Sequence, residues 1–134
     1  MKLLASSCSL LAMTLLLGCG PSTTEATTGT VTLDGEPLPD AEIIFTPEEG
    51  GRPAVAETDS GGNFELIYTV GEKGAPPGKY VVRVQTSNTT YDAEGQEIII
   101  EEKVPPKYNR HSTLVCEVKE SGENHFELEL KSED

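Results

Sequence analysis

The chain has 134 residues, and its 23 Asp and Glu against 10 Lys and Arg give a formal net charge of −13. This length accommodates one domain. The acidity argues against nucleic acid as a partner, because a duplex-binding surface needs clustered Lys and Arg, and it disfavours anionic lipid headgroups for the same reason. With nine Pro, 13 Gly and no Trp, long helices are not expected.

The first residues predict an export signal. Lys2 precedes a run of apolar and small residues over positions 3–17. This run is shorter than the roughly 20 apolar residues that a membrane-spanning helix needs, so we interpret residues 1–18 as a secretory signal. The following small and polar residues lack anything to bury, and we expect residues 19–28 to form a flexible tether. The globular domain is predicted over residues 29–134.

Residues 16–19 (LLGC) resemble the bacterial lipobox. The resemblance implies that the Cys19 thiol receives a diacylglycerol and that cleavage makes Cys19 the first residue of the mature protein. Several acyl chains would anchor the protein stably to the cell membrane or the outer membrane. Gly20 stands where Asp commonly signals inner-membrane retention, which favours the outer membrane where the cell has one. The alternative is an ordinary secretory signal that ends in Cys.

Three cysteines occur, at positions 8, 19 and 116. Cys8 falls in the predicted signal and Cys19 is the predicted lipidation site, which leaves Cys116 alone in the domain. An unpaired cysteine in an exported protein is either a reactive thiol or a dimer bridge, unless it is buried. Leu114, Cys116 and Val118 alternate with polar or outward positions, so we interpret Cys116 as a buried, inert thiol.

From residue 29 onward, apolar residues recur at alternate positions over short spans that turn residues separate. Phe126, Leu128 and Leu130 form the clearest alternation in the chain. Residues 87–96 lack periodicity and are expected to be an exposed loop, and 97–103 a short strand or a partly buried arm. The predicted strands are 30–33, 41–46, 54–58, 64–68, 79–86, 97–103, 113–119 and 124–131.

Short strands, turn-like connections and no helical period together predict an all-β fold. We expect a small antiparallel β-sandwich of about seven strands, with a partly closed barrel as the alternative. Much of the negative charge falls on outward positions such as Glu65, Glu127 and Glu129, which indicates a solvated surface rather than an acidic binding site.

Several segments resemble the carboxypeptidase regulatory-like domain. They are residues 29–41 (GTVTLDGEPLPDA), 44–47 (IFTP), 58–64 (TDSGGNF) and 75–80 (APPGKY), together with 104–109 (VPPKYN) and 124–130 (NHFELEL). The resemblance covers essentially the whole predicted mature chain and implies a transthyretin-like, or prealbumin-like, β-sandwich. It also implies a short bacterial lipoprotein built from a signal, a lipobox Cys and one such domain. These are turn and packing motifs, so they predict fold better than function.

The sequence offers no convergent set of catalytic groups, and we expect no catalytic residues, metal or cofactor. His111 and His125 lack the local spacing of a zinc site. Residues 59–63 (DSGGN) carry oxygens that suit calcium, but the longer spacing of a calcium loop is missing, and a simple turn is the preferred interpretation.

Two functions remain open. The first is a non-catalytic, lipid-anchored envelope module that binds protein or carbohydrate, or serves a structural role, through the loops 71–78, 87–96 and 104–112. Tyr91 and Tyr108 are the candidate contact residues, although each could instead pack its loop onto the sheet. The second is a small hydrolase on a transthyretin-like scaffold, which would require His111, Arg110 and another Arg (Arg52 or Arg83) to converge in a concave site.

Overall fold

The computed structural model describes residues 24–133. The predicted signal, the lipidation site Cys19 and most of the predicted tether therefore lie outside the described residues. The described part contains twelve short strands and one 3-10 turn, η1 (Pro106–Tyr108). The strands are β1 (Thr27–Leu33), β2 (Glu36–Pro37), β3 (Glu42–Pro47), β4 (Ala54–Glu57), β5 (Asn63–Glu65), β6 (Ile67–Thr69), β7 (Glu72–Lys73), β8 (Gly78–Gln85), β9 (Asn88–Tyr91), β10 (Glu97–Ile100), β11 (Val115–Val118) and β12 (Asn124–Leu130).

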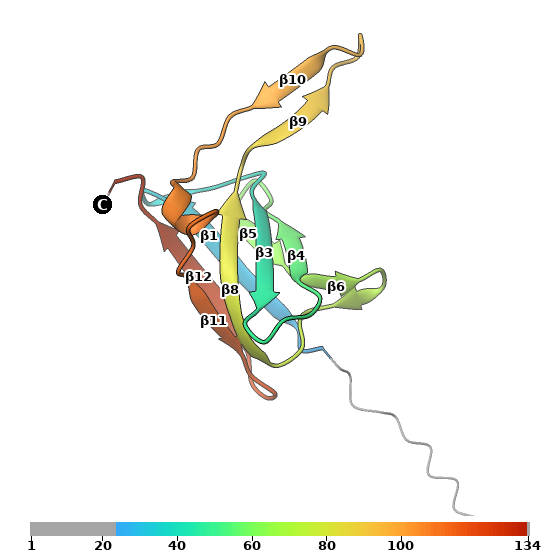
Figure 1. The fold of residues 1–134 in the computed structure, drawn as a ribbon, viewed down its shortest axis with the longest axis vertical. Coiled ribbons are helices and arrows are strands. Elements are labelled where there is room, and N and C mark those ends of the chain that lie inside the picture. The colour runs from blue at the N-terminus through green and yellow to red at the C-terminus, as the bar shows by residue number, and fades with distance from the viewer. Residues whose placement is uncertain (1–23, 134) are drawn as a thin grey trace, which may run out of the picture.

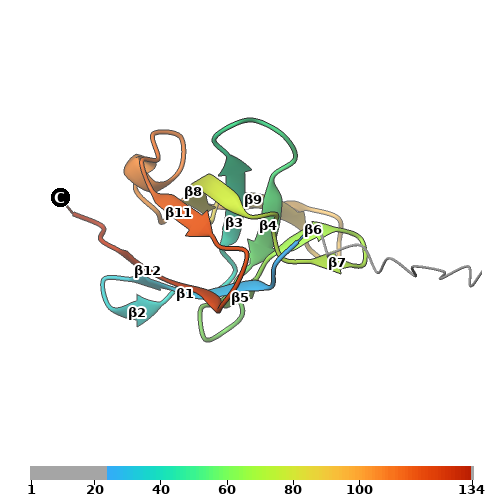
Figure 2. The same cartoon turned by 90° about the horizontal axis from the view of Figure 1, so that it is seen from below.

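The strands form two layers, which confirms the predicted all-β sandwich. One sheet has the order β12-β1-β2, with β5 also paired to β1, and the other has the order β11-β8-β3-β4-β6-β7. Seen from below, the two sheets lie face to face (Figure 2). A separate two-stranded hairpin, β9–β10, stands off one end of the sandwich (Figure 1).

The core between the layers is built around Phe45 of β3, which is fully buried. Its ring centroid lies 5.8 Å from Tyr80, 6.3 Å from Phe64 and 5.8 Å from Phe126, all in tilted arrangements. Tilted pairs of this kind are favourable beyond the area that they bury. Each strand contributes alternate residues to this core, because successive side chains of a strand point to opposite faces.

One strand pair departs from the predicted antiparallel arrangement. β1 and β12 run parallel, with Val31 paired to Leu128 and Leu33 to Leu130. Alternation reports which face of a strand is buried and is the same for both directions, so the sequence pattern could not reveal this pairing. A parallel pair needs a long connection, and here almost the whole domain lies between the two strands.

The predicted strand 64–68 is split between the two sheets. Phe64 lies in β5, which pairs with β1, whereas Ile67 lies in β6, which pairs with β4. Leu66 sits at the crossing and is fully buried, and its amide donates a hydrogen bond to the Thr27 carbonyl at 2.9 Å. The period-two pattern continues through the crossing because both sheets face the same core.

The expected loop 87–96 is instead largely a hairpin. Asn88–Tyr91 pairs antiparallel with Glu97–Ile100, and the connection is a turn closed by Asp92. All eight strand residues are exposed. Since neither face packs on a core, nothing favours alternation there, and periodicity failed as a signal for this strand.

The chain enters the fold slightly earlier than the expected domain start at Gly29. β1 begins at Thr27, a buried residue, and Glu25 already forms a bridge with Ala75 through backbone hydrogen bonds of 2.8 and 3.0 Å. Small polar residues suggested a tether here, but a Thr side chain can pair with nearby carbonyls, and the Thr27 hydroxyl donates to Glu25 O at 2.9 Å. Within residues 24–133, no helix has the length and apolar character to cross a bilayer.

Candidate functional site

The base of the β9–β10 hairpin borders a hollow of about 660 Å³. Segments 102–106 and 109–110 form most of its wall, and Arg83 and Gln85 reach it from the outward face of β8. Ser87 and Ser132 complete the lining. We refer to this feature as the basic hollow, because Arg83, Lys103 and Arg110 all line it.

Asn109 holds the wall of the basic hollow in place. The residue is buried, and its side-chain amide donates hydrogen bonds to the carbonyls of Val84, Val104 and Pro105 at 3.2–3.3 Å. Its backbone carbonyl accepts a hydrogen bond from Nε of Arg83 at 3.1 Å. A buried amide with its polar atoms satisfied is a rigid anchor, so Asn109 fastens the segment around η1 to the end of β8.

Glu102 clamps the two stems of the hairpin together. Its carboxylate accepts hydrogen bonds from the Thr86 amide and hydroxyl at 2.8 Å, from the Val104 amide at 3.1 Å and from the Ser87 amide at 3.2 Å. Burial alone would raise the pKa of Glu102, but the hydrogen bonds from Thr86, Val104 and Ser87 outweigh it and lower the pKa. Glu102 is the one acidic residue that lines the hollow within residues 24–133, and its carboxylate is engaged by four hydrogen bonds from its own surroundings.

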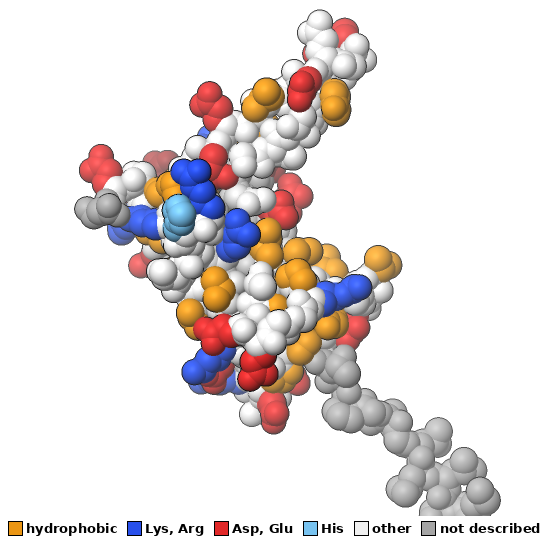
Figure 3. All heavy atoms as spheres, viewed as in Figure 1, with side chains coloured by type: hydrophobic (Ala, Val, Ile, Leu, Met, Phe, Trp, Pro, Cys, Tyr) orange, Lys and Arg blue, Asp and Glu red, His pale blue; other side chains and the backbone are white. Residues whose placement is uncertain are grey.

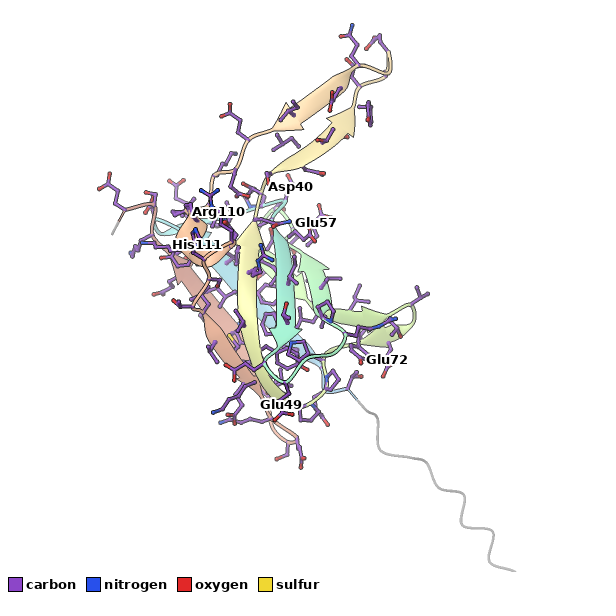
Figure 4. All side chains as sticks on the ribbon, viewed as in Figure 1. Asp40, Glu49, Glu57, Glu72, Arg110 and His111 are labelled. Carbon is purple, nitrogen blue, oxygen red and sulfur yellow. The ribbon has the colours of Figure 1, made fainter. Side chains whose placement is uncertain are left out.

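The cations of the hollow have no acidic partner in the part of the chain that the structure describes. Within residues 24–133, Arg83, Lys103 and Arg110 form no ion pair. Lys, Arg and His side chains gather on this face near η1 (Figure 3). Arg110 and His111 lie beside η1, whereas Glu49 and Glu72 lie toward the other end of the sandwich (Figure 4). In a chain of net charge −13, this is a local positive surface.

An acidic surface lies on the other side of the hairpin base. Asp40, Glu42 and Glu57 line a smaller hollow of about 340 Å³, which shares Gln85 and Ser87 with the basic hollow. Gln85, the last residue of β8, and Ser87 just after it thus separate a positive surface from a negative one. Charge of one sign in a concave surface focuses its field, so the two sides of the hairpin base differ in the ions that they attract.

The two candidate tyrosines have different environments. Tyr91 is 67% exposed at the end of β9. Tyr108 belongs to η1 and is half-buried, with its hydroxyl accepting a hydrogen bond from the Lys131 amide at 3.0 Å and Lys107 Nζ lying 5.1 Å from the ring centroid. Tyr108 thus packs the η1 segment onto the C-terminal strand, and Tyr91 is the tyrosine available for contact.

The three candidate loops are not all brought together. Segment 104–112 and Ser87 meet at the basic hollow. The Gly/Pro segment 71–78 instead contributes Pro76, Pro77 and Gly78 to a separate hollow of about 770 Å³, together with residues 47–52. A surface made from all three loops is therefore not formed.

Other candidate residues serve the fold. Cys116 is buried and unpaired, and burial raises the pKa of its thiol to about 11. Asp59 Oδ1 accepts hydrogen bonds from the amides of Gly61 and Asn63, both at 2.9 Å, which closes the turn. Within residues 24–133, no three His, Cys, Asp or Glu residues cluster in a way that could hold a metal.

The two histidines lie apart. The His111 amide donates to Pro106 O at 2.9 Å in the turn after η1. His125, on β12, bonds Thr28 Oγ1 at 2.9 Å and Glu127 Oε1 at 3.1 Å. Arg83 and Arg110 share the basic hollow, but His111 is outside its lining and Arg52 instead lies over Tyr68, with 5.9 Å from Cζ to the ring centroid. The arrangement required for the hydrolase is only partly present.

Sequence reasoning did not single out Lys103, Glu102 or Asn109. Two signals in the sequence pointed toward the lining of this hollow. Arg83 occupies the outward phase of β8, opposite the buried Val82 and Val84, and an outward cation on a central strand calls for an explanation. Asn109 closes the segment 104–109, where two prolines force a fixed backbone path. Neither signal shows that these segments meet, since that depends on the fold.

Comparison with known proteins finds partial similarity to solved structures and no match among families or curated proteins. No protein-family description matches the chain, and no curated protein matches it. Two solved structures are similar in part. A 9R-lipoxygenase from Cyanothece is 17% identical with a TM-score of 0.43, over 86% of this chain and 17% of that one. The major pilin subunit of Bacillus cereus is 14% identical with a TM-score of 0.46, over 81% of this chain and 30% of that one. The chain thus spans less than a third of either protein.

Proposed function

We propose that this protein is a non-catalytic, lipid-anchored module of the cell envelope, exported and held at the cell membrane or outer membrane through Cys19. In this role the β-sandwich is a rigid support, and the hairpin pole carries the binding surface. The hairpin pole is the end of the sandwich that bears β9, β10, η1 and the basic hollow. The partner is a protein or a carbohydrate of the envelope.

The observation that carries this proposal is the placement of the two poles. β1 starts at one end of the long axis, and the β9–β10 hairpin projects from the opposite end (Figure 1). A chain anchored through a residue that precedes β1 would point its hairpin pole away from the membrane. Loops on a rigid β-sandwich are common binding surfaces, and in this orientation they would be accessible to partners.

Sequence features support the proposed export and lipid anchoring. Residues 16–19 (LLGC) follow a short apolar run, and a cysteine in that position resembles a lipobox. The segments that resemble the carboxypeptidase regulatory-like domain include both turns and strands of the observed sandwich, such as 58–64 and 75–80. A transthyretin-like arrangement is the finer fold assignment that this resemblance suggests.

Export and lipid anchoring are tested by an intact-mass measurement on protein from the membrane fraction of its native host, compared with the Cys19→Ala variant. We expect a mass that corresponds to an acylated chain beginning at Cys19, and loss of membrane association in the variant. An unmodified chain in the soluble fraction, with the variant indistinguishable from it, contradicts the proposal.

A second measurement tests the orientation. Lys103 and Arg110 at the hairpin pole are exposed, as is Lys79 in β8 near the opposite pole. A membrane-impermeant amine reagent applied to isolated membranes should label Lys103 more than Lys79 when the hairpin pole faces away from the bilayer. The same reagent applied to detergent-solubilised protein controls for intrinsic reactivity, and equal protection of both lysines on membranes contradicts the orientation.

A further inference from the structure

We propose that the basic hollow binds a saccharide that carries a carboxylate or phosphate group. The inference deepens the proposed binding role of the hairpin pole and rests on it, although it does not depend on lipidation of Cys19. Its observations are the chemistry of the three cations, the rigidity of the wall and the mixed character of the lining.

The cations are available to an anion. Nε of Arg83 donates a hydrogen bond to the Asn109 carbonyl, and within residues 24–133 its two terminal nitrogens form no hydrogen bond or ion pair. Arg110 and Lys103 are exposed and line the same hollow. A guanidinium binds a planar carboxylate or a phosphate through two parallel hydrogen bonds, and Lys adds a point charge.

The hollow has a charge that favours an anion in spite of the acidic chain. Among the described residues, Glu102 is the one carboxylate in its lining, and that group accepts four hydrogen bonds from Thr86, Ser87 and Val104. Asp40, Glu42 and Glu57 lie on the other side of the hairpin base. An anion is therefore attracted to the Arg83 side of the hairpin base and repelled from the Asp40 side.

The remaining walls suit a sugar ring. Pro105 and Pro106 give the lining an apolar part, next to the buried Val104, whereas Gln85, Ser87 and Ser132 give it a polar part. Small-molecule sites combine an apolar wall with a few placed polar groups and have volumes of about 300–1,000 Å³, which includes the observed 660 Å³. An acidic sugar offers an apolar ring face, hydroxyl groups and one anionic group, and these match the three parts of the hollow.

The test is isothermal titration calorimetry on the full chain in a nonionic detergent. The probes are a glucuronic acid oligosaccharide, glucose 6-phosphate, inorganic phosphate and a neutral glucose oligosaccharide. We expect binding of one or both acidic saccharides that weakens with added salt, with no binding of the neutral one. The two acidic probes distinguish a carboxylate ligand from a phosphate ligand.

Variants assign the binding to the hollow. Arg110→Gln and Arg83→Gln should each weaken binding by about tenfold, because each removes a charge-assisted pair. Arg110 is exposed, so that variant keeps the test valid if the half-buried Arg83 is needed for folding. Arg52→Gln removes the same charge at a position outside the hollow and should leave binding unchanged.

Four results overturn the inference. The first is equal binding of the neutral and acidic oligosaccharides, or of inorganic phosphate and the acidic saccharides. The second is an equal loss of binding in Arg52→Gln and Arg110→Gln. The third is no heat from any probe up to about 10 mM, a concentration that reveals even weak sites. The fourth uses a glutamate tripeptide as an additional probe: if it binds as tightly as the acidic saccharides, the ligand is an acidic peptide instead. None of these results bears on whether Cys19 carries lipid.

Discussion

The inner strands of the sandwich and the β9–β10 hairpin contain similar residues in very different surroundings. Ile43 and Phe45 of β3 are fully buried, whereas Ile98, Ile99 and Ile100 of β10 are 42%, 72% and 39% exposed. Both segments pair antiparallel, so hydrogen bonding does not separate them. Residues that suit a strand therefore occur in both regions, but only in the sandwich does their burial contribute hydrophobic stabilisation.

The hairpin holds its shape through its base. An isolated two-stranded hairpin is marginally stable in water, and here the carboxylate of Glu102 joins residues from both stems. The hydroxyl of Thr86 also accepts a hydrogen bond from the Lys103 amide at 2.7 Å. Hydrogen bonds thus hold the hairpin base together, as apolar packing holds the sandwich together. They also fix the hairpin base next to the basic hollow.

The largest expected difference between the two regions is in large-to-small substitution. Phe45→Ala should lower the free energy of unfolding by about 3–5 kcal/mol, because it empties the centre of the core. Ile99→Ala should change it by less than about 0.5 kcal/mol, since Ile99 is largely in water. Urea unfolding followed by circular dichroism measures both. Similar losses in the two variants would mean that the hairpin belongs to the cooperative core.

Thiol chemistry gives the next contrast. Burial raises the pKa of Cys116 to about 11, so at pH 8 very little of it is thiolate. A cysteine placed at the exposed position 90 by Thr90→Cys should have an ordinary pKa near about 8.5 and react with iodoacetamide about a hundredfold faster or more. Peptide-resolved mass spectrometry follows each site, and denaturant should equalise the two rates. Fast alkylation of Cys116 in the folded protein would show that β11 opens readily.

Two glycines differ in the space around them, one in the packed sandwich and one in the hairpin turn. A Cβ at Gly29 would lie 2.3 Å from Cζ of Phe64 and 2.5 Å from the Phe126 carbonyl oxygen. A Cβ at Gly95, in the hairpin turn, would have no atom within 4 Å. Gly29→Ala should therefore cost about 2 kcal/mol or more through overpacking. Gly95 has a φ of 78°, and Gly95→Ala should cost about 1 kcal/mol, confined to the hairpin. Thermal unfolding compares them, and an unaffected melting temperature in Gly29→Ala contradicts the packing.

The smallest expected effect is local and depends on pH. The folded pKa of Glu102 is lowered from 4.5, so its stabilisation is fully present above that value and is lost as pH falls through the folded pKa. Amide exchange at Ser87 and Val104, corrected for its intrinsic pH dependence, should accelerate in this acidic range. Glu102→Gln should produce about a fivefold acceleration at neutral pH, as expected for a loss of about 1 kcal/mol. The β3 and β8 amides serve as controls, and equal acceleration there would indicate global rather than local opening.

Much of the sandwich was predictable from residues that report burial. The alternation in 79–86 and 124–131 located β8 and β12 to within a residue or two, because one face of each strand packs on the core. Tyr80, Val82 and Val84 are buried as expected. The prediction failed for 87–96, where both faces meet water, and for 64–68, where a continuous pattern spans two sheets.

The amino-acid sequence by itself determined the all-β class, the positions of most strands and the burial of Cys116, because alternation and turn residues are local properties. It also supplied the hypothesis of an export signal and lipidation at Cys19. The tertiary structure alone decided that β1 pairs in parallel with β12 and that 88–91 joins 97–100 in a projecting hairpin. It likewise brought Arg83, Lys103 and Arg110 to one hollow. These features depend on contacts between residues far apart in the chain, and no local pattern encodes which distant segments will meet.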